Sequence, residues 1–227
     1  MFYDYYYLIL VVPMIILSLV AQARVRSAFS KYSQIPTRSG QNGEAAARMV
    51  MSRNNVQGVE IEAVAGNMTD HYDPRRGTIG LSEPVIRTNS IAAVGVAAHE
   101  AGHASQYAAG YVPIRIRNAI LPVARFGQPI SWVLILVGLF MPAFKILIYA
   151  GIALFSAVVL FQLVTLPVEF DASRRAMATL SESGYYSEEE MKGVKTVLSA
   201  AAMTYVAAAA VSLAQLMRLL LMANRRR

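Results

Sequence analysis

Three residues of one short motif have the types and the spacing that metal chemistry needs. His99-Glu100-Ala101-Gly102-His103 holds two histidines four positions apart, with a glutamate after the first. Residues four apart share one face of an α-helix, so both imidazoles can bind a single ion, and imidazole suits zinc. The motif therefore predicts one Zn²⁺ per chain, with His99 and His103 as ligands. Glu100 can act as a general base on a zinc-activated water without binding the metal.

A catalytic zinc uses three protein ligands and leaves one position open for water. The chain has no cysteine and only three histidines, so the third ligand is His71 or a carboxylate. Glu169 is the best candidate, because it directly follows a long uncharged stretch, and carboxylates at the ends of membrane helices tend to be functional. Asp171 is its rival. His71 and Tyr205 are candidates for stabilising the oxyanion of peptide hydrolysis.

The histidines lie in the polar segment 24–118, which is long enough to fold outside a membrane. Asn89-Ser90 is a suitable cap for a helix running from Ile91 to about Ala108. Val56–Ala65 and Thr78–Ser82 read as strands, and His71–Gly77 is rich in turn residues. The second strand offers an edge on which an extended peptide substrate could pair.

Long uncharged stretches separate the remaining polar segments. About 20 apolar residues span the hydrocarbon core of a bilayer as a helix. The four stretches that reach this length are 5–23, 126–144, 146–168 and 196–217. The fourth is rich in alanine, which suits close helix packing within a membrane and equally suits packing on protein. The sequence thus predicts three or four transmembrane helices.

The charge distribution predicts an orientation. Residues 24–118 hold 11 Lys and Arg and residues 169–195 hold 4, so both segments are expected on the cytoplasmic side of the cell membrane. The two spans between His103 and Glu169 form a hairpin, which returns the chain to that side. The terminal Arg225–Arg227 run would then lie on the opposite side if the fourth stretch spans, against the rule. The net charge of +7 belongs to loops between spans, so nucleic-acid binding is not expected.

The overall composition agrees with this arrangement. Hydrophobic residues make up 56% of the 227 residues and charged residues 15%, which excludes a disordered chain, and the lack of cysteine excludes a disulfide scaffold. We expect one domain, 1–227: an α-helical, multi-pass integral membrane protein. Its small α+β cytoplasmic portion, 24–118 and 169–195, carries the HExxH helix.

Several segments resemble the small bacterial membrane zinc metallopeptidases of the YugP-like family, and more distantly the HtpX-like and CAAX-prenyl endopeptidase membrane gluzincins. The segments that carry the resemblance are Thr69–Pro74, Ile79–Ser82, Val96–His103, Leu166–Ser173 and Ala201–Val206. The resemblance implies a zincin-like membrane endopeptidase that acts on a peptide or protein substrate. It also implies zinc binding by His99, His103 and Glu169, and a catalytic Glu100.

One position departs from the wider HtpX-like pattern, and two other classes of protein compete with the peptidase. Those families place Asp four residues after the ligand Glu, where this chain has Ser173, while its acid stands at Asp171. A membrane scaffold or transport protein with a structural zinc is the main alternative, and Glu100 discriminates because a structural site needs no general base. A soluble zinc protease with a single anchor is disfavoured by the length of the second and third stretches.

Overall fold

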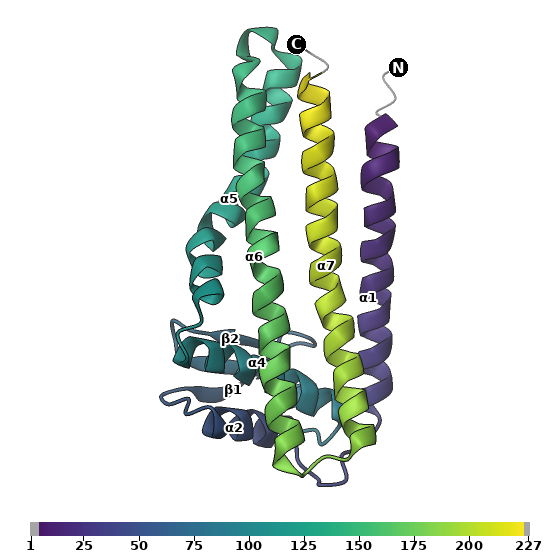
Figure 1. Ribbon diagram of the computed structural model, residues 1–227, viewed down its shortest axis with the longest axis vertical. Helices are drawn as coiled ribbons and strands as arrows, with labels where there is room; N and C mark the ends of the chain where they lie inside the picture. Colours follow the sequence, from purple (N-terminus) through teal and green to yellow (C-terminus); the bar gives the residue numbers. More distant parts are fainter. Residues whose placement is uncertain (1–4, 225–227) are drawn as a thin grey trace. The chain divides into compact units, whose positions relative to one another are not determined.

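The computed structural model describes residues 5–224 and is mostly helical, with one small sheet (Figure 1). The elements in chain order are η1 (Tyr7–Val11), α1 (Val12–Ser33), α2 (Gly43–Arg53), β1 (Glu60–Val64), β2 (His71–Asp73), β3 (Thr78–Ser82), α3 (Glu83–Ile86), α4 (Ile91–Ala108), α5 (Val112–Phe140), η2 (Pro142–Phe144), α6 (Ile146–Ser183) and α7 (Glu188–Asn224).

Four helical segments are long and apolar enough to cross a membrane: Tyr7–Ser33, Val112–Phe140, Ile146–Ser183 and Glu188–Asn224. They overlap the four uncharged stretches found in the sequence. The third stretch and the alanine-rich fourth lie wholly within α6 and α7, whereas α5 ends at Phe140, before the second stretch ends at 144. The prediction of a helical protein with three or four such segments is confirmed by these lengths and compositions. The terminal Arg225–Arg227 run lies outside the described residues.

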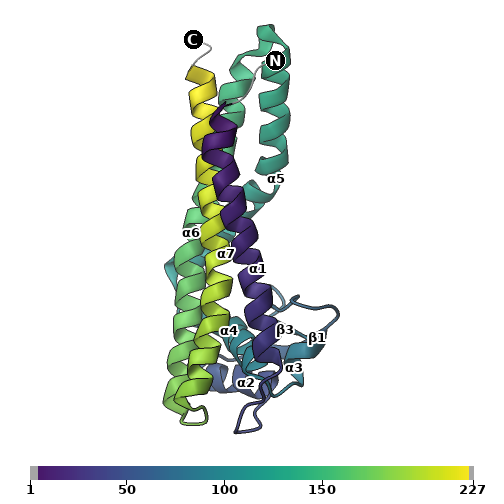
Figure 2. The same cartoon turned by 90° about the vertical axis from the view of Figure 1, so that its right-hand side faces the viewer.

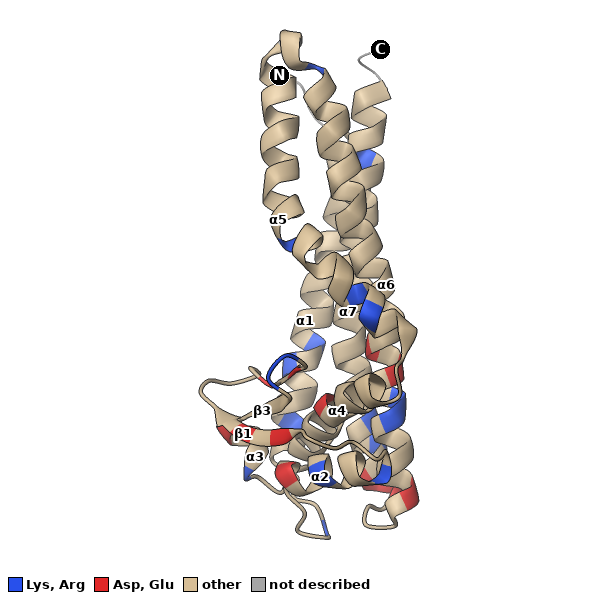
Figure 3. Cartoon of the chain, turned by 90° about the vertical axis from the view of Figure 1, so that its left-hand side faces the viewer, with Lys and Arg blue, Asp and Glu red and all other residues tan. Residues whose placement is uncertain are grey.

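The chain divides into two compact units. The apolar unit comprises Met1–Ala21, Pro113–Leu166 and Thr204–Arg227, and the α+β unit comprises Gln22–Val112 and Pro167–Met203. The apolar unit has its own cluster of buried side chains, in which Trp132 packs edge-on against Phe155. Among the described residues, every Asp and Glu belongs to the α+β unit (Figure 3). Carboxylate chemistry is therefore confined to that unit in the part of the chain that the structure describes.

The sheet of the α+β unit has the strand order β1-β3-β2. Two of its strands, β1 and β3, are labelled in Figure 2. β1 pairs with β3 in parallel and β2 pairs with β3 antiparallel. The prediction that Thr78–Ser82 offers a pairing edge is therefore wrong, because β3 is the central strand and is hydrogen-bonded on both sides. The turn-rich segment contains β2, the second neighbour of β3. A tight turn follows β2, and in it the Asp73 carboxylate accepts a hydrogen bond from the Arg75 backbone N–H at 2.8 Å.

Helix α4 passes through the core of the α+β unit. Ser90 caps it, its hydroxyl accepting a hydrogen bond from the Ala93 N–H, as the sequence predicts. Its small side chains let α2 pack closely, and it also contacts β2 and β3. α2 begins in the same way, with Asn42 as the capping residue. The capped helix α2 and the strands β2 and β3 thus hold α4 in place.

Candidate metal centre

The two motif histidines lie on α4, one turn apart. Their ring centroids are 4.7 Å apart in an edge-to-face arrangement. Residues at this spacing lie on one face of the helix, so both rings point to the same side of α4. Glu100 is the next residue after His99 and is partly buried.

A carboxylate from α6 completes this cluster. Glu169 Oε2 lies 3.2 Å from His99 Nε2 and 3.6 Å from His103 Nε2. One ligand atom from each of the three residues lies within 4.8 Å of the others, and only 2% of the surface of Glu169 is exposed. The two imidazoles and one buried carboxylate are thus arranged as a single set of donors, and the structure includes Glu169 in it but not Asp171.

The close approach of α4 and α6 depends on a glycine inside the motif. A Cβ at Gly102 would lie 2.5 Å from the backbone oxygen of Ala172, which is closer than side chains tolerate. Because Ala172 follows Glu169 by three residues on α6, this contact sets how near the carboxylate comes to the two histidines. Sequence reasoning missed this role of Gly102, since the motif leaves the residue type at that position open.

We expect Gly102→Ala to lower both zinc affinity and stability. The new methyl group meets backbone rather than a flexible side chain, so α4 and α6 must move apart, at a cost of about 1–3 kcal/mol. Gly95→Ala is the matched control, because its Cβ would meet a Val194 side-chain carbon of α7 at 3.3 Å. Zinc titration and thermal unfolding of both variants check this. Equal effects of the two substitutions would contradict a special role for Gly102.

The electrostatics of the cluster favour a charged imidazole opposite the carboxylate. Burial by itself would lower the pKa of His103, but hydrogen bonding to Glu169 and the nearby charge of Glu100 outweigh it and raise the pKa above its usual range. A metal ion competes with this proton, because a histidine must be neutral to bind it.

The remaining ring nitrogens have partners of their own. His99 Nδ1 is hydrogen-bonded to Ser173 Oγ at 3.0 Å, and His103 Nδ1 to Gln106 Oε1 at 3.1 Å. Both Nε2 atoms therefore face Glu169, while both Nδ1 atoms are held from outside the cluster. Ser173, which stands where the wider family pattern has Asp, thus contacts a motif histidine.

The carboxylate of Asp171 is engaged elsewhere. It pairs with Arg174 and Arg175 of its own helix and accepts a hydrogen bond from Gln106 Nε2. The contact between Gln106 and His103 was not predicted from the sequence, although residues three positions apart on a helix are neighbours. That spacing was the available signal.

Two other sequence candidates lie outside the donor set. His71 is exposed on β2, and its Nδ1 is hydrogen-bonded to the backbone oxygen of Thr69 at 2.9 Å. Tyr205 lies on the part of α7 that belongs to the apolar unit. Their suggested contribution to oxyanion stabilisation stays a prediction.

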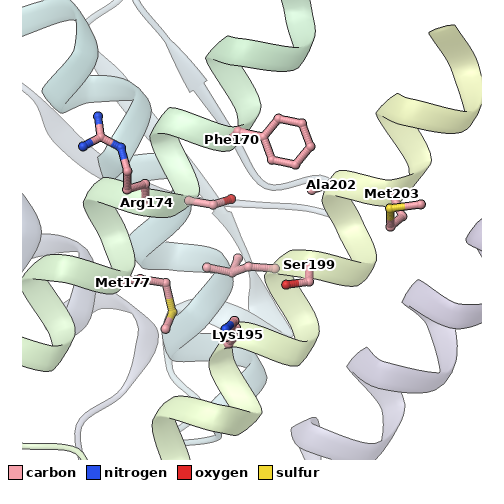
Figure 4. A pocket seen from close by; sticks show the side chains of 9 residues that line it. Phe170, Arg174, Met177, Lys195, Ser199, Ala202 and Met203 are labelled. Carbon is pink, nitrogen blue, oxygen red and sulfur yellow. The ribbon is translucent and has the colours of Figure 1, made fainter.

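An apolar groove of about 280 Å³ lies between the parts of α6 and α7 that belong to the α+β unit (Figure 4). Phe170, Met177 and Met203 contribute to its lining, and the Arg174 guanidinium points away from it. Ser173, the partner of His99, also lines the groove. The groove therefore borders the cluster from the α6 side.

Comparison with known proteins relates this chain to a zinc metallopeptidase family. Residues 7–224 match the family described as "Putative neutral zinc metallopeptidase". A protein of Bacillus subtilis (strain 168) named "Putative membrane protease YugP" is 47% identical over 202 residues, which is 89% of each chain. No solved structure matches the chain significantly. The match covers nearly all of the sequence, and this chain belongs to the neutral zinc metallopeptidase family that it identifies.

Proposed function

We propose that this chain is a membrane-embedded zinc endopeptidase of the gluzincin type. The observation that carries the proposal is the convergence of His99, His103 and Glu169 from two helices, with Glu100 next to the first histidine. The family, the name of the relative and the four apolar helices support a zinc peptidase in a membrane.

The donor set fits zinc. Two imidazole nitrogens and one carboxylate oxygen are three ligands of types that zinc prefers, and three protein ligands with an open position are typical of catalytic rather than structural zinc sites. A zinc ion held there would act as a Lewis acid on the scissile carbonyl and lower the pKa of water. His99, His103 and Glu169 would hold it.

The proton transfers fall to Glu100. Its carboxylate would take a proton from the attacking water and later donate that proton to the leaving amine. Glu169 is buried and bonded to two histidines, so it is poorly placed for the same task. His71 and Tyr205 remain the candidates for donating hydrogen bonds to the oxyanion.

An extended peptide is the substrate that the sheet fits best. The outer strands are β1 and β2, and main-chain pairing on an outer strand holds a peptide without requiring a particular sequence. β2 is the better candidate, because its Tyr72 ring packs 5.4 Å from the ring of Tyr107, one helical turn after His103. Burial, followed by the neighbouring Tyr107, raises the pKa of Tyr72, so its hydroxyl stays protonated.

The proposed topology follows the distribution of charge. With spans near 5–23, 126–144, 146–168 and 196–217, the excess of lysines and arginines in 24–118 and 169–195 favours a cytoplasmic location for those segments. The single domain 1–227 would then be a multi-pass protein of the cell membrane whose catalytic residues act on cytoplasmic peptides or proteins.

Removal and return of zinc test the proposal. Treating the purified, detergent-solubilised protein with a zinc chelator such as phenanthroline should abolish cleavage of a peptide library, since the Lewis acid is lost. Stoichiometric zinc should restore the cleavage and magnesium should not, because magnesium prefers oxygen ligands. Mass spectrometry of the digests measures both. Cleavage that persists in metal-free protein would refute the proposal.

A further inference from the structure

Gln106 is a fully buried amide next to the candidate metal centre. Its side chain has no exposed surface and lies on α4, three residues after His103. A buried amide is costly unless its hydrogen bonds are made. Here the oxygen is bonded to His103 Nδ1, and the nitrogen donates to the Val168 backbone oxygen at 2.8 Å and to Asp171 Oδ2 at 3.0 Å.

These partners leave Gln106 one orientation. A backbone carbonyl and a carboxylate can only accept hydrogen bonds, so the amide nitrogen must face α6 and the amide oxygen must face His103. An amide oxygen in turn only accepts. His103 Nδ1 must therefore carry a proton. Nε2 faces Glu169 Oε2, 3.6 Å away, so it can carry a second proton while no metal is bound, and zinc would replace that second proton rather than the one on Nδ1.

The α6 end of this chain of hydrogen bonds is firmly held. Asp171 is almost fully buried, and Arg175 Nε donates to it at 2.7 Å, with Arg174 as a further partner. Val168 is the residue immediately before Glu169. Gln106 thus connects the helix of the histidines to the segment of α6 that presents the carboxylate.

The partner of the other histidine lacks this property. The Ser173 hydroxyl can donate or accept, so its hydrogen bond to His99 Nδ1 is compatible with either neutral form of that ring. The two histidines are therefore held differently at Nδ1, where only His103 has a partner atom that can do nothing but accept.

We propose that Gln106 is a positioning residue that fixes His103 in the Nδ1-protonated tautomer and so prepares Nε2 to bind zinc. The proposal rests on the proposed function for the identity of the metal. Outer hydrogen-bond partners of metal-binding histidines typically change metal affinity by about 10–100-fold, and we expect Gln106→Met to weaken zinc binding within that range.

The test uses zinc affinity and the tautomer itself, both independent of peptide cleavage. Zinc affinity is measured by chelator competition on the full-length protein in detergent. The tautomer is measured by nitrogen NMR of isotope-labelled histidine in metal-free protein, at a pH high enough to keep the ring neutral. The chain has only three histidines, which makes assignment by single substitution practical.

Three results are expected. His103 of the wild type is protonated at Nδ1, Gln106→Met shifts it towards the Nε2-protonated form and weakens zinc binding, and the matched control Ser173→Ala leaves the His103 signals unchanged. An Nε2-protonated His103 in the wild type overturns the proposal even if Gln106→Met fails to fold. Zinc affinity that is unchanged in a folded Gln106→Met also overturns it. Absence of peptidase activity in the wild type would instead count against the proposed function alone.

Discussion

Glu100→Gln is expected to abolish peptide cleavage while zinc remains bound. The amide keeps the size of the side chain but cannot accept the proton of the attacking water. Losing a general acid–base group typically costs about 10²–10⁴-fold in rate, which brings a slow peptidase to background. Because Glu100 lies outside the group of three donors, metal content should stay at one zinc per chain. Peptide digestion and metal analysis on the same preparation measure both quantities.

The matched control is Glu83→Gln, which alters an exposed glutamate of the α+β unit and should change neither quantity. If Glu100→Gln cleaves peptides as fast as the wild type, the zinc site has no general base at this position. Another residue would then have to take the proton of the attacking water. Only a zinc-loaded wild type that cleaves no peptide would be better described as a membrane scaffold or transport protein with a structural zinc. Loss of zinc from the variant would instead give Glu100 a role in holding the metal.

Local structure could be predicted well because its causes are local. The Ser90 side chain caps the helix that the sequence places after it, since capping depends on residues within one turn. The apolar helices follow from the lengths of uncharged sequence. The order of the strands could not be predicted, because β2 pairs with β3 through only three residues of a segment rich in turn signals.

The sequence predicts the residues of the ligand cluster better than it predicts their hydrogen-bond partners. HExxH spacing and the position of Glu169 after an uncharged stretch are visible in the sequence. The hydrogen bonds that Gln106 and Ser173 make between α4 and α6 join residues 62 to 74 positions apart, so they depend on how α4 packs on α6. That packing depends on the near-contact between Gly102 and the Ala172 backbone, which no local pattern indicates.

Glu169→Ala is expected to remove zinc from the protein. The substitution leaves two imidazoles facing a buried space without a carboxylate, so one of three ligands and the only negative charge among them are lost. The loss of affinity should exceed the roughly 10–100-fold effect typical of outer hydrogen-bond partners, and therefore exceed that of Gln106→Met. Metal analysis after dialysis against a weak chelator measures it, with Glu182→Ala, an exposed position on the same helix, as the control.

Full zinc occupancy in Glu169→Ala would show that another residue is the third ligand. Substitutions of Asp171 and of His71 would then distinguish these two alternatives. Asp171 could reach the metal only by giving up Arg175 and Gln106, so Asp171→Asn should disturb zinc binding strongly if it were the ligand. His71 could reach the metal only by moving away from Thr69, since its Nδ1 is hydrogen-bonded to the Thr69 backbone oxygen. Because both rivals must break existing hydrogen bonds, while Glu169 Oε2 already lies 3.2 and 3.6 Å from the two histidine Nε2 atoms, we expect the effect to fall on Glu169.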